Sequence, residues 1–278
     1  MSDIFLHADD FGRSELITSN IYKCIKYGSI NSISVMMGFG KFYFKKIKKI
    51  KKLKKLKIKL HINLTEEKKQ KFAFKENTFI KLLLIKFSKG YKEKRCRVFN
   101  EIESQLISFK KEFSLKKIYI DSHEHVHIIP WIFDILIELS SKHNIVEIRL
   151  PNESFFICNF KDLFNKNYLL NVIKLIVIKF LLLLNKKKNS KKTNFVCFTG
   201  IMYSGIQNLN SILNGFKLSK KNEKKNGTEI LVHPGFSSSK EKNIFQIKYY
   251  QFYSSLNRIV EYCLCCDKKI MKEIKKIL

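Results

Sequence analysis

The stretch Ile58-Lys59-Leu60-His61-Ile62-Asn63-Leu64 alternates strictly between apolar and polar side chains. Such alternation predicts a β-strand with two unlike faces. The four aliphatic side chains point one way, whereas Lys59, His61 and Asn63 point the other way. In a barrel, the aliphatic set would pack under surrounding helices, and the polar set would face the interior at the carboxyl end of the strand.

Similar apolar runs recur along the chain, separated by segments with helical periodicity. Strands that alternate with helices predict an α/β protein with a mostly parallel sheet and right-handed crossovers. A length of 278 residues suits one large domain or two small ones. We expect strands at residues 4–8, 32–36, 58–64, 117–121, 147–150 and 229–233, and helices at residues 13–26, 45–57, 98–113, 130–141 and 168–185.

Six of the seven histidines lie in four short motifs, each of which closes a predicted strand. The seventh, His143, follows a predicted helix, and we expect it at the surface. Imidazoles and carboxylates gathered at strand ends are the usual way to build a metal site in an α/β enzyme. The four motifs are His7-Ala8-Asp9-Asp10-Phe11-Gly12, His61-Ile62-Asn63-Leu64, Asp121-Ser122-His123-Glu124-His125-Val126-His127 and His233-Pro234-Gly235.

The pair Asp9-Asp10 offers two carboxylates at the end of the first strand. Because successive side chains of a strand diverge, one can bind a metal while the other acts as a general base. One of them could instead cap the helix that follows. His123, His125 and His127 share one face if the backbone stays extended, and buried imidazoles need a metal or an acidic partner. Two imidazoles and one carboxylate form a catalytic metal set with positions left for water and substrate.

Taken together, these motifs resemble those of the YdjC-like (ChbG-type) carbohydrate deacetylases. Members of that family are metal-dependent hydrolases that remove N-acetyl groups from amino sugars such as chitooligosaccharides. The motifs occur in the family's order and span nearly the whole chain. Besides the four above, the resemblance rests on Thr65, Pro130, Ile148-Arg149-Leu150-Pro151, Thr199-Gly200, Ser204-Gly205 and Glu229-Ile230-Leu231-Val232.

The resemblance implies a distorted TIM-like (β/α) barrel in which residues 1–278 form a single domain. By motif position, it implies that Asp10, His61 and His123 bind one divalent metal ion. A ligand set of two histidines and one aspartate suits Zn²⁺, whereas the resemblance suggests Mg²⁺. The implied reaction is attack of a metal-activated water on an acetamide carbonyl, which releases acetate and a free amine.

The other motif residues receive their roles from the same resemblance. Asp9 is implied as the general base, and His233 as the general acid or as a group beside the oxyanion. His125, His127 and Arg149 are implied as contacts to the substrate or as supports of the metal ligands.

The chain departs from the family's pattern at several positions. Lys59 stands where the family usually has glycine, and His7 stands where it often has asparagine. Residues 160–195 are rich in lysine and leucine, and we expect a variable excursion there. None of these changes removes an expected metal ligand, so they bear on the substrate rather than on the chemistry. A chitooligosaccharide, a lipid-linked amino sugar and a nucleotide sugar all stay open.

The composition is strongly basic, with a formal net charge of +30. Only five of the 54 basic residues are arginine, the residue that reads phosphates and bases, so we expect no specific nucleic-acid partner. Seven irregularly spaced cysteines and the lack of a signal-peptide pattern predict a reducing, cytoplasmic location. The apolar stretch 168–185 contains two lysines, so we expect no transmembrane segment. Peripheral membrane contact and a homodimer stay open.

Two other functions compete with deacetylation. A metal-dependent phosphoesterase could use the same ligands, but such enzymes often need two metals, and a second ligand set is not evident in the sequence. The other alternative is a basic protein that binds polyanions or membrane surfaces on a decayed barrel. The intact set of expected ligands argues against decay.

Overall fold

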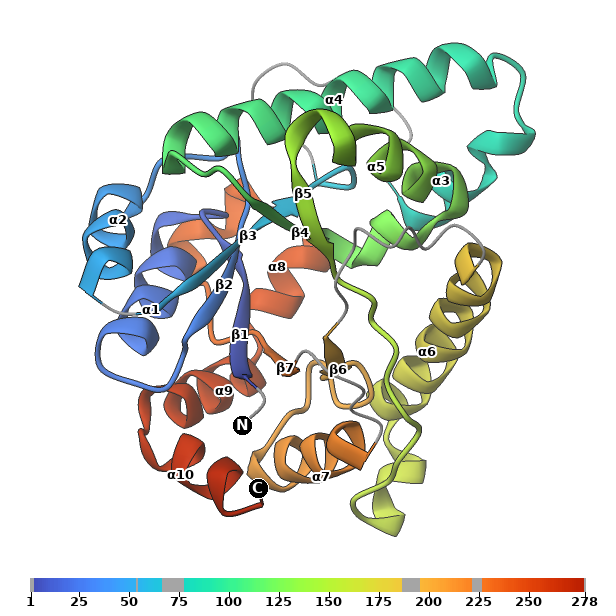
Figure 1. Cartoon of the computed structure of the whole chain (residues 1–278). Helices are drawn as coiled ribbons and strands as arrows, with labels where there is room; N and C mark the ends of the chain where they lie inside the picture. The colour runs from blue at the N-terminus through green and yellow to red at the C-terminus, as the bar shows by residue number, and fades with distance from the viewer. Residues whose placement is uncertain (1–2, 54, 67–77, 187–195, 222–226, 278) are drawn as a thin grey trace.

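The computed structural model describes residues 3–53, 55–66, 78–186, 196–221 and 227–277. Seven strands form one curled sheet, and helices pack around it (Figure 1). Every strand pair is parallel, because a helix or a long connection separates each strand from the next. The strands are β1 (Ile4–Phe11), β2 (Ser32–Val35), β3 (Lys57–Ile62), β4 (Ile118–Ser122), β5 (Ile145–Ile148), β6 (Cys197–Thr199) and β7 (Thr228–Val232).

The helices follow the strands in the order expected of a β/α barrel. The short 3₁₀ segments include η2 (His123–Ile128), η3 (Phe160–Phe164) and η5 (Ser239–Ile244), of which η2 and η3 matter below. The α-helices are α1 (Glu15–Lys26), α2 (Phe44–Leu53), α3 (Phe79–Leu84), α4 (Tyr91–Phe113), α5 (Pro130–His143), α6 (Lys166–Asn185), α7 (Leu209–Lys221), α8 (Ile247–Tyr253), α9 (Leu256–Cys266) and α10 (Lys269–Lys276).

The barrel is open on one side. The sheet order is β5-β4-β3-β2-β1-β7-β6. In a closed barrel the strands would follow one another from β1 to β7 and back to β1, and here the pairing of β5 with β6 is the one that is missing from the described residues. The Glu153 carboxylate spans this gap from the β5 side, because it accepts hydrogen bonds from the backbone N–H groups of Gly200, Ile201 and Met202 after β6, at 2.7–2.8 Å. The predicted α/β class and distorted barrel are therefore confirmed.

The two faces predicted for β3 are also confirmed. Its aliphatic residues are buried in the hydrophobic core that the helices share with the sheet. Lys59, on the other face, lies fully buried inside the barrel. Its Nζ lies 2.5 Å from Glu229 Oε2 and 2.8 Å from Glu147 Oε1. These two carboxylates offset the cost of burying the ammonium, so the barrel accommodates lysine at this position.

All predicted strands and helices are present, with boundaries shifted by a few residues, except that α4 begins at Tyr91 rather than near residue 98. Strand β6 and helices α3, α7, α8, α9 and α10 lie outside the ranges predicted above. The surface position predicted for His143 was wrong. This histidine is buried because α5 packs on α4, and its Nε2 lies 2.8 Å from Glu103 Oε1. Of the lysine-rich excursion, residues 160–186 form η3 and α6, and residues 187–195 lie outside the described residues.

Candidate active site

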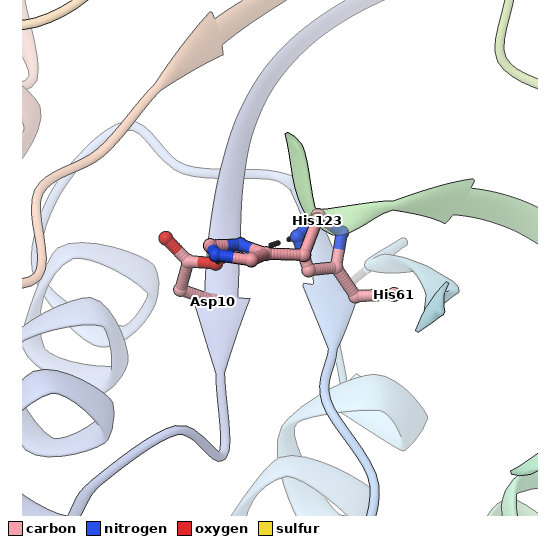
Figure 2. Close-up of side chains that lie close together, drawn as sticks. All are labelled: Asp10, His61 and His123. Atoms are coloured by element: carbon pink, nitrogen blue, oxygen red, sulfur yellow. Dashed lines mark hydrogen bonds and ion pairs between the residues drawn. The ribbon is translucent and has the colours of Figure 1, made fainter. Parts of the chain in front are cut away.

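Three of the sequence-predicted residues meet at the carboxyl ends of the strands. Asp10 comes from β1, His61 from β3 and His123 from the residue after β4. His61 Nε2 and His123 Nδ1 lie 3.3 Å and 3.2 Å from the same oxygen, Asp10 Oδ1. Figure 2 shows the two imidazoles and the carboxylate pointing toward one another. One ligand atom from each residue lies within 4.8 Å of the others, a spacing that suits a single metal ion.

The backbone at Asp10 is unusual. Its φ is +68°, a left-handed conformation that non-glycine residues adopt rarely, and the β1–β2 register shifts between Ala8 and Phe11. Such strain is typical of residues held in place for a function. Asp10 does not cap the next helix, and neither does Asp9, because the Ser14 hydroxyl takes that role by accepting from the Ile17 N–H.

Both histidines of the cluster have a carboxylate behind them. His61 Nδ1 donates to Asp121 Oδ1 at 2.6 Å, and His123 Nε2 lies 3.0 Å from Glu66 Oε1. Glu66 in turn forms a buried ion pair with Arg13. Carboxylates in this position fix the ring orientation and raise the basicity of metal-binding histidines. The sequence analysis missed Glu66, because the only available signal was an acidic residue five positions after His61.

The electrostatic field of the cluster favours positive charge. Burial alone would lower the pKa of His61, but the Asp9 and Asp121 carboxylates raise it to about 9. Burial is likewise overcome at His123, where hydrogen bonds to Asp10 and Glu66 raise the pKa to about 10. Burial raises the pKa of Asp10, but the hydrogen bonds and charges of His123 and His61 lower it more. The pKa of Asp10 therefore lies well below its usual range. A divalent ion would take the place of the two imidazole protons, so the donor set fits such an ion.

A second cluster lies beside the first, inside the barrel. His7, Asp9 and Asp121 also bring ligand atoms within 4.8 Å of one another. Here, however, a cation is already present: Arg149 Nη2 lies 2.9 Å from Asp9 Oδ1 and 2.7 Å from Asp121 Oδ2. Arg149 Nε also donates to Glu229 at 2.6 Å. The guanidinium occupies the place that a second metal of a two-metal phosphoesterase would need.

We call Asp10, His61 and His123 the metal cluster, because together they could hold a metal ion. A cavity of about 250 Å³ opens over this cluster. His233, from the end of β7, lines it on the opposite side from the ligands of β3 and β4. Burial, with a contribution from Arg258, lowers the pKa of His233 to about 3, so the ring is neutral near pH 7. Its Nδ1 is buried and has no hydrogen-bond partner in the part of the chain that the structure describes. A ring that lines the cavity and has a buried nitrogen without a partner is suited to contact a ligand.

The comparisons with known proteins agree with this geometry. The sequence model of the YdjC-like protein family matches residues 3–276. The chain belongs to the YdjC-like family. A carbohydrate deacetylase of Danio rerio is 26% identical over 161 residues, which cover 55% of this chain and 51% of that protein. A carbohydrate deacetylase of Clostridium beijerinckii is 25% identical over 147 residues, covering 51% and 58%. The matched stretch thus spans only a little over half of the length of these relatives.

A solved structure extends the likeness of the YdjC-like fold to the whole chain. It is the crystal structure of a proposed cellobiose-phosphate cleavage protein from Enterococcus faecalis V583. The two structures align with a TM-score of 0.66 over 99% of this chain and 94% of that chain, at 19% sequence identity. At this identity, the likeness shows a shared fold.

In this YdjC-like chain, the histidine-rich segment is not extended as its spacing suggested. It forms the 3₁₀ segment η2, with left-handed φ values of +52° at Glu124 and +56° at His125. The three histidines therefore do not share one face, and that expectation was wrong. His123 joins the metal cluster, His125 lines the cavity and His127 packs behind it.

The residues expected to contact substrate or support the site differ in their positions. His125 lines the cavity, and burial together with Lys174 holds its pKa well below the usual range. His127 accepts from the Ser122 hydroxyl and donates to the Arg149 carbonyl at 2.7 Å, so it connects β4 to the end of β5. Arg149 is buried under the cavity, where it holds Asp9. Side chains outside the predicted site residues also line the cavity, among them Glu124, Lys174, Lys248, Tyr249 and Phe252.

The second departure from the family pattern, His7, also has partners. Its Nδ1 lies 2.6 Å from the Ser32 hydroxyl, and its Nε2 lies 2.7 Å from the Ser34 hydroxyl and 3.0 Å from Asp9 Oδ1. The His7 ring therefore connects β1 to β2 and also contacts the Asp9 carboxylate. Because the serines satisfy it, this histidine is accommodated without disturbing the metal cluster.

Proposed function

We propose that this chain is a metal-dependent hydrolase that removes an N-acetyl group from an amino sugar. The observation that carries the proposal is the convergence of Asp10 with two carboxylate-backed histidines at the base of a cavity. The names of the relatives, both carbohydrate deacetylases, support the substrate class. We extend that activity to this chain as a hypothesis.

The cluster of Asp10, His61 and His123 would hold one divalent ion, Mg²⁺ or Zn²⁺. Such an ion supplies a Lewis acid that polarises the acetamide carbonyl and activates water for attack. Burial raises the pKa of Asp9, but Arg149 and the nearby histidines bring it well below the usual range, so the carboxylate is ionised near pH 7. We assign it the role of general base.

His233 faces this machinery from the other wall of the cavity. Two roles were open for it, general acid and oxyanion-side donor. A pKa of about 3 leaves the ring without the extra proton that a general acid carries at neutral pH. The neutral ring still has one N–H group, so we favour a hydrogen bond from His233 to the oxygen of the attacked carbonyl.

Acetate release from N-acetylglucosamine oligomers tests the proposal. Metal-loaded protein should release acetate, whereas chelated protein and His123→Ala should not. His143→Gln changes a buried histidine outside the cavity and serves as the matched control. Metal binding without acetate release from any amino sugar would contradict the substrate class. Failure to bind a metal would contradict the catalytic proposal and favour the basic-surface alternative.

We also propose that the protein works in a reducing compartment, the cytoplasm. The described residues include all seven cysteines and contain no disulfide bond, which supports that location. We retain a homodimer as a hypothesis that size measurement in solution would test.

A further inference from the structure

Helix α6 has an outer face made almost wholly of apolar side chains. From Leu169 to Leu184, every exposed side chain is Leu, Ile, Val or Phe, with the single exception of Lys174. Ile173 and Phe180 are both 59% exposed. The helix lies at the periphery of the molecule (Figure 1). A soluble surface helix normally turns its apolar stripe inward and its polar side outward, so this arrangement calls for a partner.

The apolar surface continues into the segment before the helix. η3 contacts α6 and exposes the rings of Phe160 and Phe164. We call the exposed apolar side chains of η3 and α6 the α6 face. It is larger than the scattered apolar residues found on most soluble surfaces, because eight positions of α6 and three of η3 contribute to it.

The inner side of α6 is fastened to the barrel. Asn171 Nδ2 donates to the carbonyls of Met202 and Ser204 at 3.2 Å and 2.8 Å, and Asn185 Nδ2 donates to the Ile128 carbonyl at 2.7 Å. By length and composition alone, α6 could cross a membrane. Its attachment to the barrel, with Leu175 buried between, instead favours a helix that lies along a surface.

The charges around the α6 face favour an anionic partner. Residues 155–186 contain five lysines and a single acidic residue, Asp162. The whole chain carries a net charge of +30, so a second copy would meet strong like-charge repulsion at this surface. An apolar helix face in a lysine-rich segment matches the interface of a bilayer that contains anionic lipids.

We propose that the α6 face docks this protein on an anionic membrane surface. The cavity lies beside helix α6, because Lys174 of this helix lines the cavity wall. Docking would therefore bring the metal cluster close to the headgroups. If the proposed deacetylase function holds, the substrate that this arrangement suits is an amino sugar carried on a lipid, with the acetamide in the cavity and the lipid in the bilayer.

Vesicle flotation tests the docking directly and needs no turnover. Wild-type protein should float with vesicles that contain phosphatidylglycerol, and should float at least tenfold less with pure phosphatidylcholine. I173E/F180E should lose at least tenfold of the binding to anionic vesicles. F87E/I107E is the matched control, because it makes the same changes at side chains that are 82% and 52% exposed on other elements. Melting followed by circular dichroism checks that both variants fold.

Three results would overturn the docking proposal. The first is no flotation of the wild type with anionic vesicles. The second is an equal loss in both double variants, which would assign the binding to net charge alone. The third is a dimer in solution that I173E/F180E converts to a monomer, which would make the α6 face a contact between two copies.

The substrate part has its own test. Acetate release from an N-acetylglucosaminyl lipid should be at least tenfold faster in anionic vesicles than in neutral ones. Equal rates in the two kinds of vesicle would contradict the proposal of a lipid-linked substrate but not the proposal of membrane docking. No release from any amino sugar, with flotation retained, would instead contradict the proposed deacetylase function.

Discussion

Arg149 donates two hydrogen bonds to Asp9, from Nη1 to Oδ2 at 3.0 Å and from Nη2 to Oδ1 at 2.9 Å. The same guanidinium lies 2.7 Å from Asp121 Oδ2, and Asp121 in turn orients His61. One arginine from the open edge of the barrel thus connects the proposed base to a proposed metal ligand. The same position sets a guanidinium against the second carboxylate-rich cluster, where its charge offsets those of Asp9 and Asp121.

Arg149→Lys should therefore separate catalysis from metal binding. A lysine keeps the positive charge but cannot hold both oxygens of Asp9 at once. We expect acetate release to fall about a hundredfold, because a base misplaced by about 1 Å costs that much, while the metal affinity changes little. Calorimetric metal titration and a rate measurement on the same preparation check this. A rate close to that of the wild type would show that the two-point contact is not needed.

Glu66→Gln tests the support behind His123. The neutral amide no longer fixes the orientation of the His123 ring or raises the basicity of its metal-binding nitrogen, so we expect the affinity for a divalent ion to fall about 10- to 100-fold. Glu103→Gln is the control, since Glu103 also pairs with a histidine, His143, outside the cavity. Equal metal affinities for both variants and the wild type would show that Glu66 does not support metal binding.

Glu153→Gln tests the link across the open side of the barrel. The carboxylate accepts from three backbone N–H groups and from the Thr199 hydroxyl. An amide has one acceptor oxygen, so buried donors lose their partner, and we expect the free energy of unfolding to drop by about 2 kcal/mol. Glu112→Gln, at a more exposed pair with Lys41 and Lys48, should cost about 1 kcal/mol or less. Urea unfolding of both variants makes the comparison.

The buried His127 predicts a loss of stability in acid. Burial lowers its pKa from 6.5 to about 4 in the folded protein. The unfolded chain therefore binds a proton first as the pH falls, and stability is lost between pH 6.5 and about 4, by about 3 kcal/mol from this group. His127→Gln, which keeps a donor for the Arg149 carbonyl, should lose less stability over the same window. Parallel slopes of unfolding free energy against pH would refute this.

Much of the fold follows from local patterns. The alternation in β3 fixed which residues face the barrel interior, and the strand-end position of Asp10 and His61 placed both at one edge of the sheet. Sequence alone could not place η2, because Glu124 and His125 adopt left-handed φ values that are normally the preference of glycine. The contacts of His123 and His127 with other strands hold that turn, and such contacts have no local signature.

The sequence by itself determined the α/β class and most of the strands and helices, since these depend on periodicity within one element. The three expected metal ligands came from the resemblance of the motifs to the YdjC-like family. Only the tertiary structure decided what lies between elements. It paired Glu66 with His123, placed the Arg149 guanidinium between Asp9 and Asp121, and left one side of the barrel open. It also showed that α6 buries one apolar face in the core and leaves another exposed. The hydrophobic effect is non-directional, so an apolar side chain in the sequence does not indicate which neighbour will cover it. Only the folded structure shows that.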